Sequence, residues 1–444
     1  MKKILQFLVL TLLVAAFKSY ALADDNVLVS SWQEKSYLNS EGKSAEVLIK
    51  ARIQNLPKNY VMTSFGIDFG SDNKISIKNV TCDGVQIKFE FVNNALKVDF
   101  AKQKVNGEEF ALYISYNEKY KKIHKYLRQE AILIPPFAKD AQAKVVIEFP
   151  WYLESATLNY NITKVGNSFV YQNKVPPAGV MEMIKLTPAQ SAWSALAKTS
   201  VKSNAALEDV TIEIPNYFNH PRQKIENRSL LASVSPVKTT KENNRYLLKF
   251  DSERKDILIE NRANIFTGKS YGKLVNFNPS EHLKYNQEDR ELLEHILFKI
   301  RQSPKYAAFP LYAKIGNFVY DFIKYDRSLV GRRFSVRQIL SNPVGVCTEY
   351  SRLFNELARV AGIPSMILSG VACGEYNSCE GHVWNMIYYN NQWLEVDPTW
   401  NLMSGIVSSS HVYFSNEDQS SVGTQYPGDG REVRLELDME LKPL

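Results

Sequence analysis

The chain has 444 residues, of which 45% are hydrophobic and 23% are charged, and its formal net charge is +7. This composition is typical of globular proteins and excludes a disordered tail protein, a coiled coil, a collagen and a polytopic membrane protein. The length predicts two or three domains, because single hydrophobic cores seldom grow beyond about 250 to 300 residues. The sequence has no basic run with interleaved aromatic residues, so we expect no nucleic-acid partner.

The first 23 residues have the three parts of a secretory signal peptide. Lys2 and Lys3 precede the apolar run 4–17, and Ala21 and Ala23 form a small-x-small cleavage pattern. This run of 14 residues is shorter than the roughly 20 that a helix needs to span a bilayer. We therefore predict cleavage after Ala23 and an exported protein, periplasmic or secreted, with no stable membrane span. Loss of this segment, which holds three lysines and no acid, would lower the net charge to +4.

Residues 24–160 follow a period of two, which is typical of strands with one buried face. Val47, Ile49 and Ala51 alternate with polar residues, and turn clusters separate such runs at short intervals. We predict an antiparallel β-sandwich domain over 24–160 and a second β-rich module over 161–275. A single large β domain through residue 275 is the alternative.

After residue 278 the hydrophobic period changes to that of helices. The pattern predicts helices over 292–300 and 311–322, a third helix that follows Gly345 and extends to Ala361, and strands over 366–368, 382–389 and 393–396. Gly362 can take the left-handed position that ends a helix, and Pro364 cannot continue one. Helices followed by antiparallel strands predict an α+β domain over 276–430, with a C-terminal tail at 431–444.

Three side chains of this region could act together in nucleophilic catalysis. Cys347 opens the third predicted helix, where free N–H groups and the helix dipole favour an anion. His382 and Asp397 lie near the same end of two neighbouring strands, so the carboxylate could orient the imidazole that accepts the thiol proton. Taken singly, a buried cysteine or a histidine on a strand is more often structural than catalytic. The hypothesis therefore depends on the three residues meeting in space.

Four short motifs contain or flank these residues. They are Gly345-Val346-Cys347 at a helix start, Gly362-Ile363-Pro364 at its end, His382-Val383-Trp384 on a strand and Asp397-Pro398-Thr399-Trp400 on the next. This arrangement over residues 285–425 resembles the transglutaminase-like superfamily. The resemblance implies a papain-like core with Cys347 as the nucleophile, His382 as the base and then the acid, and Asp397 as the orienting carboxylate. Trp384 and Trp400 would shape and dry the site, with a pure core role as the alternative.

The chain also departs from the family pattern. Members often carry an arginine before Gly-x-Cys and another after Gly-Ile-Pro, where this chain has Pro343-Val344 and Ser365-Met366. The departure concerns substrate contacts rather than the triad. The upstream β region is similar to that of exported bacterial proteins that place a β-sandwich ahead of such a core. The resemblance further implies attack on a peptide or carboxamide carbonyl through a thioester. The backbone N–H of Cys347 would be one oxyanion donor, and the second is not identified.

The remaining cysteines allow two different structures. Cys373 and Cys379 flank a short polar loop that a disulfide could close in an oxidising compartment, and two free thiols are the alternative. Cys82 lies where a strand runs into a turn and is expected to be a small buried side chain. A zinc site of Cys373, Cys379, His382 and His411 is a rival hypothesis, although the spacing matches no familiar zinc pattern. We expect no metal and no cofactor.

Three functions from different classes are consistent with this sequence. The first is a peptidase or amidase that acts on a protein or peptide, including cell-wall peptide. The second is a protein-glutamine acyl transferase that cross-links its substrates. The third is a non-catalytic binding or assembly protein, which an intact triad argues against. We favour hydrolysis because neither an amine site nor a D-x-D-x-D-G calcium loop is evident. The sequence does not define the oligomeric state or the role of the β modules.

Overall fold

The computed structural model describes residues 26–56, 58, 62–69, 74–93, 95–120, 127–150, 153–155, 162–177, 179–215, 217, 220–242, 245–268, 278–374, 379–416, 423–425 and 431–444. The predicted signal peptide at 1–23 lies outside these residues. The chain divides into two compact units. Unit 1 lies within Met1–Ile123, Gln129–Leu153 and Asn159–Ile184, and unit 2 lies within His124–Arg128, Glu154–Leu158 and Lys185–Leu444.

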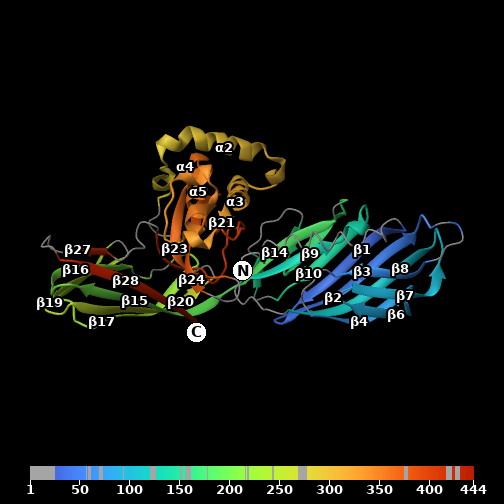
Figure 1. Ribbon diagram of the computed structural model, residues 1–444, viewed down its shortest axis with the longest axis horizontal. Coiled ribbons are helices and arrows are strands. Elements are labelled where there is room, and N and C mark those ends of the chain that lie inside the picture. The colour runs from blue at the N-terminus through green and yellow to red at the C-terminus, as the bar shows by residue number, and fades with distance from the viewer. Residues whose placement is uncertain are drawn as a thin grey trace. The chain divides into compact units, whose positions relative to one another are not determined.

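Unit 1 is built from strands, coloured blue to green in Figure 1. They are β1 (Val27–Leu38), β2 (Gly42–Ile53), β3 (Met62–Asp68), β4 (Lys74–Cys82), β5 (Val85–Gln86), β6 (Lys88–Val92), β7 (Ala95–Lys104), β8 (Glu109–Lys119), β9 (Arg128–Ile134), β10 (Gln142–Glu148), β11 (Leu153–Ser155), β12 (Ile162–Val165), β13 (Ser168–Lys174) and β14 (Val180–Pro188), with a short 3-10 helix at Pro136–Ala138. One sheet has the order β12-β13-β10-β1-β2-β8-β4-β5, a second has the order β3-β7-β6, and a third has the order β11-β14-β9. The strands β9, β11 and β14 extend beyond unit 1, because Arg128 and residues 154–155 and 185–188 belong to unit 2.

The period of two in unit 1 produces a buried face. Val47, Ile49 and Ala51 of β2 are at most 4% exposed, because alternate side chains of a strand point to opposite faces. The large sheet is mixed rather than purely antiparallel, since β1 pairs in parallel with β10. The segments that form β12 and β13 were predicted to belong to the second module, but β13 pairs with β10 of this sheet and β12 pairs with β13. Phe169 and Tyr171 of β13 are buried there.

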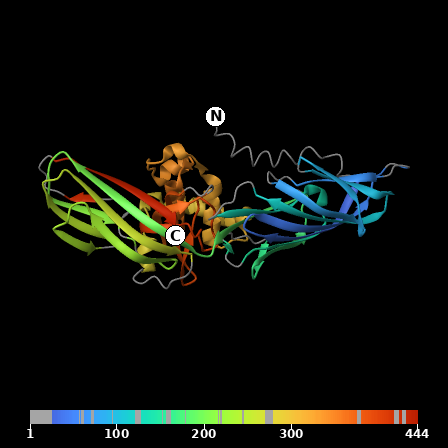
Figure 2. The same cartoon turned by 90° about the horizontal axis from the view of Figure 1, so that it is seen from below.

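Unit 2 contains a second β module of two four-stranded sheets, with the orders β17-β20-β15-β28 and β18-β19-β16-β27 (Figure 2). Its strands are β15 (Ser191–Ser203), β16 (Leu207–Pro215), β17 (Gln223–Ala232), β18 (Lys238–Glu242), β19 (Arg245–Ser252), β20 (Asp256–Thr267), β27 (Gly423–Gln425) and β28 (Val433–Pro443). The segment 431–444, expected to be a tail, supplies β28, which pairs antiparallel with β15. Leu435, Leu437 and Leu441 alternate along β28 and pack against buried clusters, which explains why this segment is a strand.

The α-helices of the described residues lie between the strands of the second β module in the sequence. They are α2 (Arg290–Gln302), α3 (Leu311–Phe322), α4 (Val336–Ser341) and α5 (Cys347–Val360), with 3-10 helices at Pro279–Leu283, Gln287–Asp289, Pro304–Tyr306 and Arg327–Leu329. The predicted apolar stripes meet in one core that contains Leu293, Leu297, Ile315, Val319, Leu353, Phe354 and Leu357. Gly362 has a φ of 80° and ends α5 as predicted.

A four-stranded antiparallel sheet packs against α5. Its order is β25-β24-β23-β26, with β23 (Ser365–Cys373), β24 (Cys379–Tyr389), β25 (Gln392–Val396) and β26 (Val412–Asn416). Both residues of the predicted turn, Asn390 and Asn391, have positive φ. The sheet shares a core with the second β module, in which Val371 and Val412 lie with Trp193. No helix within the described residues is both long and apolar enough to cross a bilayer.

Candidate active site

Cys347 is the first residue of α5, directly after the segment that holds the start of this helix in place. The strand β22 (Val344–Gly345) pairs in parallel with β21 (Lys324–Tyr325). The Glu349 carboxylate accepts a hydrogen bond from the backbone N–H of Val346 at 3.0 Å. A Cβ atom on Gly345 would come within 2.5 Å of Glu349 Cβ, so a side chain there would displace the helix start. Cys347 itself is partly exposed.

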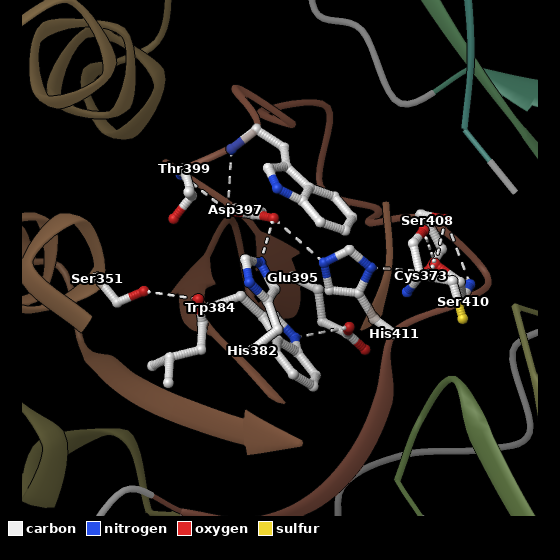
Figure 3. A network of polar contacts seen from close by, with 12 residues as sticks. Ser351, Cys373, His382, Trp384, Glu395, Asp397, Thr399, Ser408, Ser410 and His411 are labelled. Carbon is white, nitrogen blue, oxygen red and sulfur yellow. Dashed lines mark hydrogen bonds and ion pairs between the residues drawn. The ribbon is translucent and has the colours of Figure 1, made fainter. Parts of the chain in front are cut away.

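His382, on β24, lies between Cys347 and Asp397. Its Nε2 is 2.9 Å from Asp397 Oδ2, and its side chain also forms a hydrogen bond with Cys347. Because Nε2 faces the carboxylate, Nδ1 is the ring nitrogen that remains for the sulfur. Figure 3 shows the imidazole of His382 below the carboxylate of Asp397. The structure therefore brings together the three residues that the sequence singled out.

Asp397 follows β25, and its carboxylate is fully buried. Oδ1 accepts hydrogen bonds from the backbone N–H groups of Thr399 at 2.8 Å and Trp400 at 3.2 Å. Oδ2 lies 3.2 Å from His411 Nε2 in addition to its contact with His382. Burial opposes the anion, but the charge and hydrogen bond of His382 and the hydrogen bond of His411 outweigh burial and lower the pKa of Asp397. Asp397 is therefore an anion at neutral pH.

The pKa of His382 is raised from 6.5 to about 10. Burial favours the neutral ring, but the charge and hydrogen bond of Asp397, followed by the hydrogen bond and charge of Cys347, favour the cation. At neutral pH His382 is then an imidazolium beside the sulfur. A cationic histidine next to a cysteine favours the thiolate, which is the nucleophilic form. The arrangement can therefore support nucleophilic attack by Cys347.

Residues 298–398, which include Cys347, His382 and Asp397, match the family model of the transglutaminase-like superfamily. The chain carries a transglutaminase-like domain. This domain stands at the C-terminal end of a multidomain chain whose other sheets form the β modules.

Solved structures also resemble the chain, at low identity. A candidate cysteine protease from Cytophaga hutchinsonii matches 57% of this chain and 92% of its own chain, with 15% identity and a TM-score of 0.41. Leukotriene A4 hydrolase from Saccharomyces cerevisiae matches 41% of this chain at 14% identity, with a TM-score of 0.28, and an M1 zinc metallopeptidase from Deinococcus radiodurans matches 41% at 10% identity, with a TM-score of 0.27. The match spans 33% and 45% of those two chains. No curated protein matches the chain.

Two tryptophans of the transglutaminase-like domain flank His382. The ring of Trp400 stacks on His382 with centroids 4.5 Å apart, and the ring of Trp384 lies 6.2 Å away. Trp384 is fully buried, and its Nε1–H donates to Glu395 Oε2 at 3.3 Å. Both rings pack against His382, and Trp384 is also part of the sheet core.

The cysteine pair of the transglutaminase-like domain forms a disulfide. Cys373 ends β23, Cys379 begins β24, and their sulfurs are 2.01 Å apart. Bonded sulfurs offer no thiolate, so these cysteines cannot serve the zinc site considered above. A different set could hold a divalent ion, because single ligand atoms of His382, Asp397 and His411 lie within 4.8 Å of one another. The same atoms form the hydrogen bonds described above.

Sequence reasoning missed two buried histidines of unit 2. His411 was considered only as a zinc ligand, but it is the second histidine on Asp397. His220 was not singled out, but it is 5% exposed, and its Nδ1 is 3.1 Å from Glu395 Oε1. His124 lies outside the described residues. Neither missed residue belongs to a motif, so only the tertiary structure reveals its partners.

Proposed function

We propose that the transglutaminase-like domain is a thiol hydrolase that cleaves a peptide or carboxamide bond with Cys347, His382 and Asp397. The observation that carries the proposal is the position of His382, whose side chain forms hydrogen bonds with both Cys347 and Asp397. The family match over 298–398 supports the same assignment. The substrate is then a protein or peptide, with cell-wall peptide as one candidate class.

The reaction divides into two half-reactions around a thioester. In the first, Cys347 Sγ attacks the carbonyl carbon while its former proton is on His382. The C–N bond breaks, His382 gives the proton to the leaving amine, and the acyl group stays on sulfur. In the second, a water gives a proton to His382 and its oxygen attacks the thioester. The C–S bond breaks, the acid leaves, and the proton returns to the sulfur.

The oxyanion that forms in each half-reaction needs a hydrogen-bond donor. The backbone N–H of Cys347 is suited to this role because the first N–H groups of a helix have no partner within the helix. Asp397 remains an anion throughout and stabilises the imidazolium of His382. Cys347 is partly exposed, so water can reach the thioester and act as the acyl acceptor.

The proposal is tested with a mixture of casein peptides in water enriched in oxygen-18, with and without monodansylcadaverine. We expect mass spectrometry to find new carboxyl groups that carry the heavy oxygen, in wild type but not in Cys347→Ala. Incorporation of the amine without cleavage would show that the enzyme catalyses acyl transfer and not hydrolysis. Equal products from wild type and Cys347→Ala would show that the chemistry does not involve this thiol.

We also propose that the protein is exported and loses its first 23 residues. The disulfide between Cys373 and Cys379 supports export, because such bonds persist in oxidising compartments. The test is N-terminal sequencing of the protein recovered from the periplasm and from the medium of a bacterial host. Export predicts a mature chain that begins at Asp24, whereas an intact Met1 in the cytoplasm would contradict it.

A further inference from the structure

His411 contacts the triad carboxylate at the same oxygen as His382. Its Nε2 is 3.2 Å from Asp397 Oδ2, and its Nδ1 is 3.1 Å from the carbonyl oxygen of Ser408. The side chain has no solvent exposure. Its ring meets those of Trp384 and Trp400 edge-on, each with centroids 5.0 Å apart. Figure 3 shows His382 and His411 converging on the same oxygen of Asp397.

The two contacts of His411 require different proton arrangements. A carboxylate and a carbonyl oxygen only accept hydrogen bonds, so both ring nitrogens of His411 would need a proton to satisfy both contacts. A neutral imidazole carries one proton and can donate to only one of them. Because Asp397 Oδ2 carries charge and the Ser408 oxygen does not, the hydrogen bond to Asp397 is the stronger of the two. The neutral ring therefore places its proton on Nε2.

Burial favours this neutral form, and the charges around His411 act in both directions. Asp397 and Glu395 attract a proton to the ring, while the imidazolium of His382 repels it. His220 and Arg222 line the same small cavity as His411 and Glu395. Burial is the largest influence, and together with the charge of His382 it lowers the pKa of His411 despite the two carboxylates. One carboxylate at Asp397 thus faces one cationic and one neutral histidine.

Residues of the second β module, together with Thr187 near the end of β14, hold the loop that carries His411, residues 403–411. The backbone N–H of Ser409 donates to Thr187 Oγ1 at 2.8 Å, and Trp193 Nε1–H donates to the Ser409 carbonyl at 3.3 Å. Beyond the loop, the side-chain amide of Gln223 exchanges two hydrogen bonds of 2.8 Å with the backbone of Tyr413. The position of His411 is therefore set by residues outside the matched family segment.

We propose that His411 is a positioning residue of the triad, which donates its Nε2–H to Asp397 Oδ2 and is held in place by the second β module. This inference rests on the proposed function. The hydrogen bond orients the carboxylate toward His382 and takes up part of its negative charge. Without it, water cannot replace the donor at this buried oxygen, and Asp397 would hold the proton of His382 more tightly. His382 would then release that proton to the leaving amine less readily.

The test compares two replacements of similar length. His411→Gln keeps an N–H donor near the position of Nε2, whereas His411→Met removes it. The rate of Cys347 alkylation by iodoacetamide is followed against pH, and the upper limb of the profile reports loss of the His382 proton. We expect the apparent pKa of this limb to rise by about one in His411→Met, a tenfold change in proton affinity, and to stay near wild type in His411→Gln. The inference would be overturned if the apparent pKa of the upper limb were unchanged in folded His411→Met, or if it shifted equally in both variants.

A second measurement needs no variant to fold. Nitrogen-15 NMR of histidine-labelled wild-type protein reports the protonation of each ring nitrogen. We expect His411 to be neutral with its proton on Nε2 while His382 is cationic, and a proton on Nδ1 alone would contradict this. A separate result would contradict the proposed function itself. If the alkylation profile were identical in wild type and His382→Ala, His382 would not act on Cys347, whatever the role of His411.

Discussion

Replacement of Asp397 by asparagine removes the charge on which the proposed mechanism depends while it preserves the size of the side chain. The carboxylate accepts hydrogen bonds from two backbone N–H groups and faces two histidine nitrogens. An asparagine presents one oxygen and one NH₂ group to these donors, so one side of the amide meets N–H groups with no acceptor. We expect a folded domain of reduced stability in Asp397→Asn, because each buried donor left unpaired costs about 1 to 3 kcal/mol.

The effect on the thiol can be worked from the pKa of His382. The rise from 6.5 to about 10 corresponds to about 5 kcal/mol at 1.36 kcal/mol for each unit of pKa, and Asp397 is the largest favourable contribution. In Asp397→Asn burial is no longer outweighed, so His382 becomes neutral near neutral pH. A cysteine without a cationic partner has a pKa of about 8.5 and is only a few per cent thiolate there. We therefore expect the alkylation of Cys347 to slow by about thirtyfold.

The assay is the rate of iodoacetamide modification of Cys347 against pH, measured by peptide mass spectrometry. Wild type should react faster than Asp397→Asn at neutral pH, and the rate of Asp397→Asn should rise with pH as it does for an ordinary thiol. Asp256→Asn, at an exposed position, is the matched control and should behave as wild type. A wild-type rate and pH profile in Asp397→Asn would refute this reasoning.

Three further results are expected. Iodoacetamide at neutral pH should modify Cys347 and leave Cys82 unmodified in peptide maps. Burial, followed by the Asp83 charge, raises the pKa of Cys82 to about 11. Modification of both cysteines at the same rate would contradict this. Gly345→Ala should slow Cys347 labelling at least about tenfold through its clash with Glu349. Gly66→Ala should not, because its added Cβ would lie 4.0 Å from the nearest atom, the Leu96 carbonyl oxygen. Replacing Cys373 and Cys379 by alanine should lower the free energy of unfolding in urea by about 2 kcal/mol, and an unchanged midpoint would show that the bridge does not stabilise the fold.

Much of the transglutaminase-like domain could be predicted because its determinants are local in sequence. The apolar stripe of α5, its end at Gly362 and the Asn390–Asn391 turn each lie within a short segment, and the structure places them as expected. The turn sets the register of β24 and β25, which brings Asp397 to the end of the sheet that carries His382. The meeting of these two residues follows from that register.

The remaining features depend on pairings between distant segments. The strand β28 pairs with β15, which lies more than two hundred positions earlier in the sequence. No local pattern in β28 identifies β15 as its pairing strand. His411 follows three serines in a loop without periodicity, so its contact with Asp397 had no sequence signal. Similarly, β13 alternates as any strand does, and only its pairing with β10 assigns it to unit 1. Strand order and buried polar partners are tertiary properties.

The central claim is that Cys347 carries the acyl group, with His382 as its proton partner. Its most direct test is to mix the protein with para-nitrophenyl acetate, quench in acid, and locate the acetyl group by peptide mass spectrometry. Our account predicts a hydroxylamine-sensitive thioester on Cys347, formed much more slowly in His382→Ala and absent in Cys347→Ala. An acetyl group on Cys82 or elsewhere, at the same level in Cys347→Ala as in wild type, would contradict it.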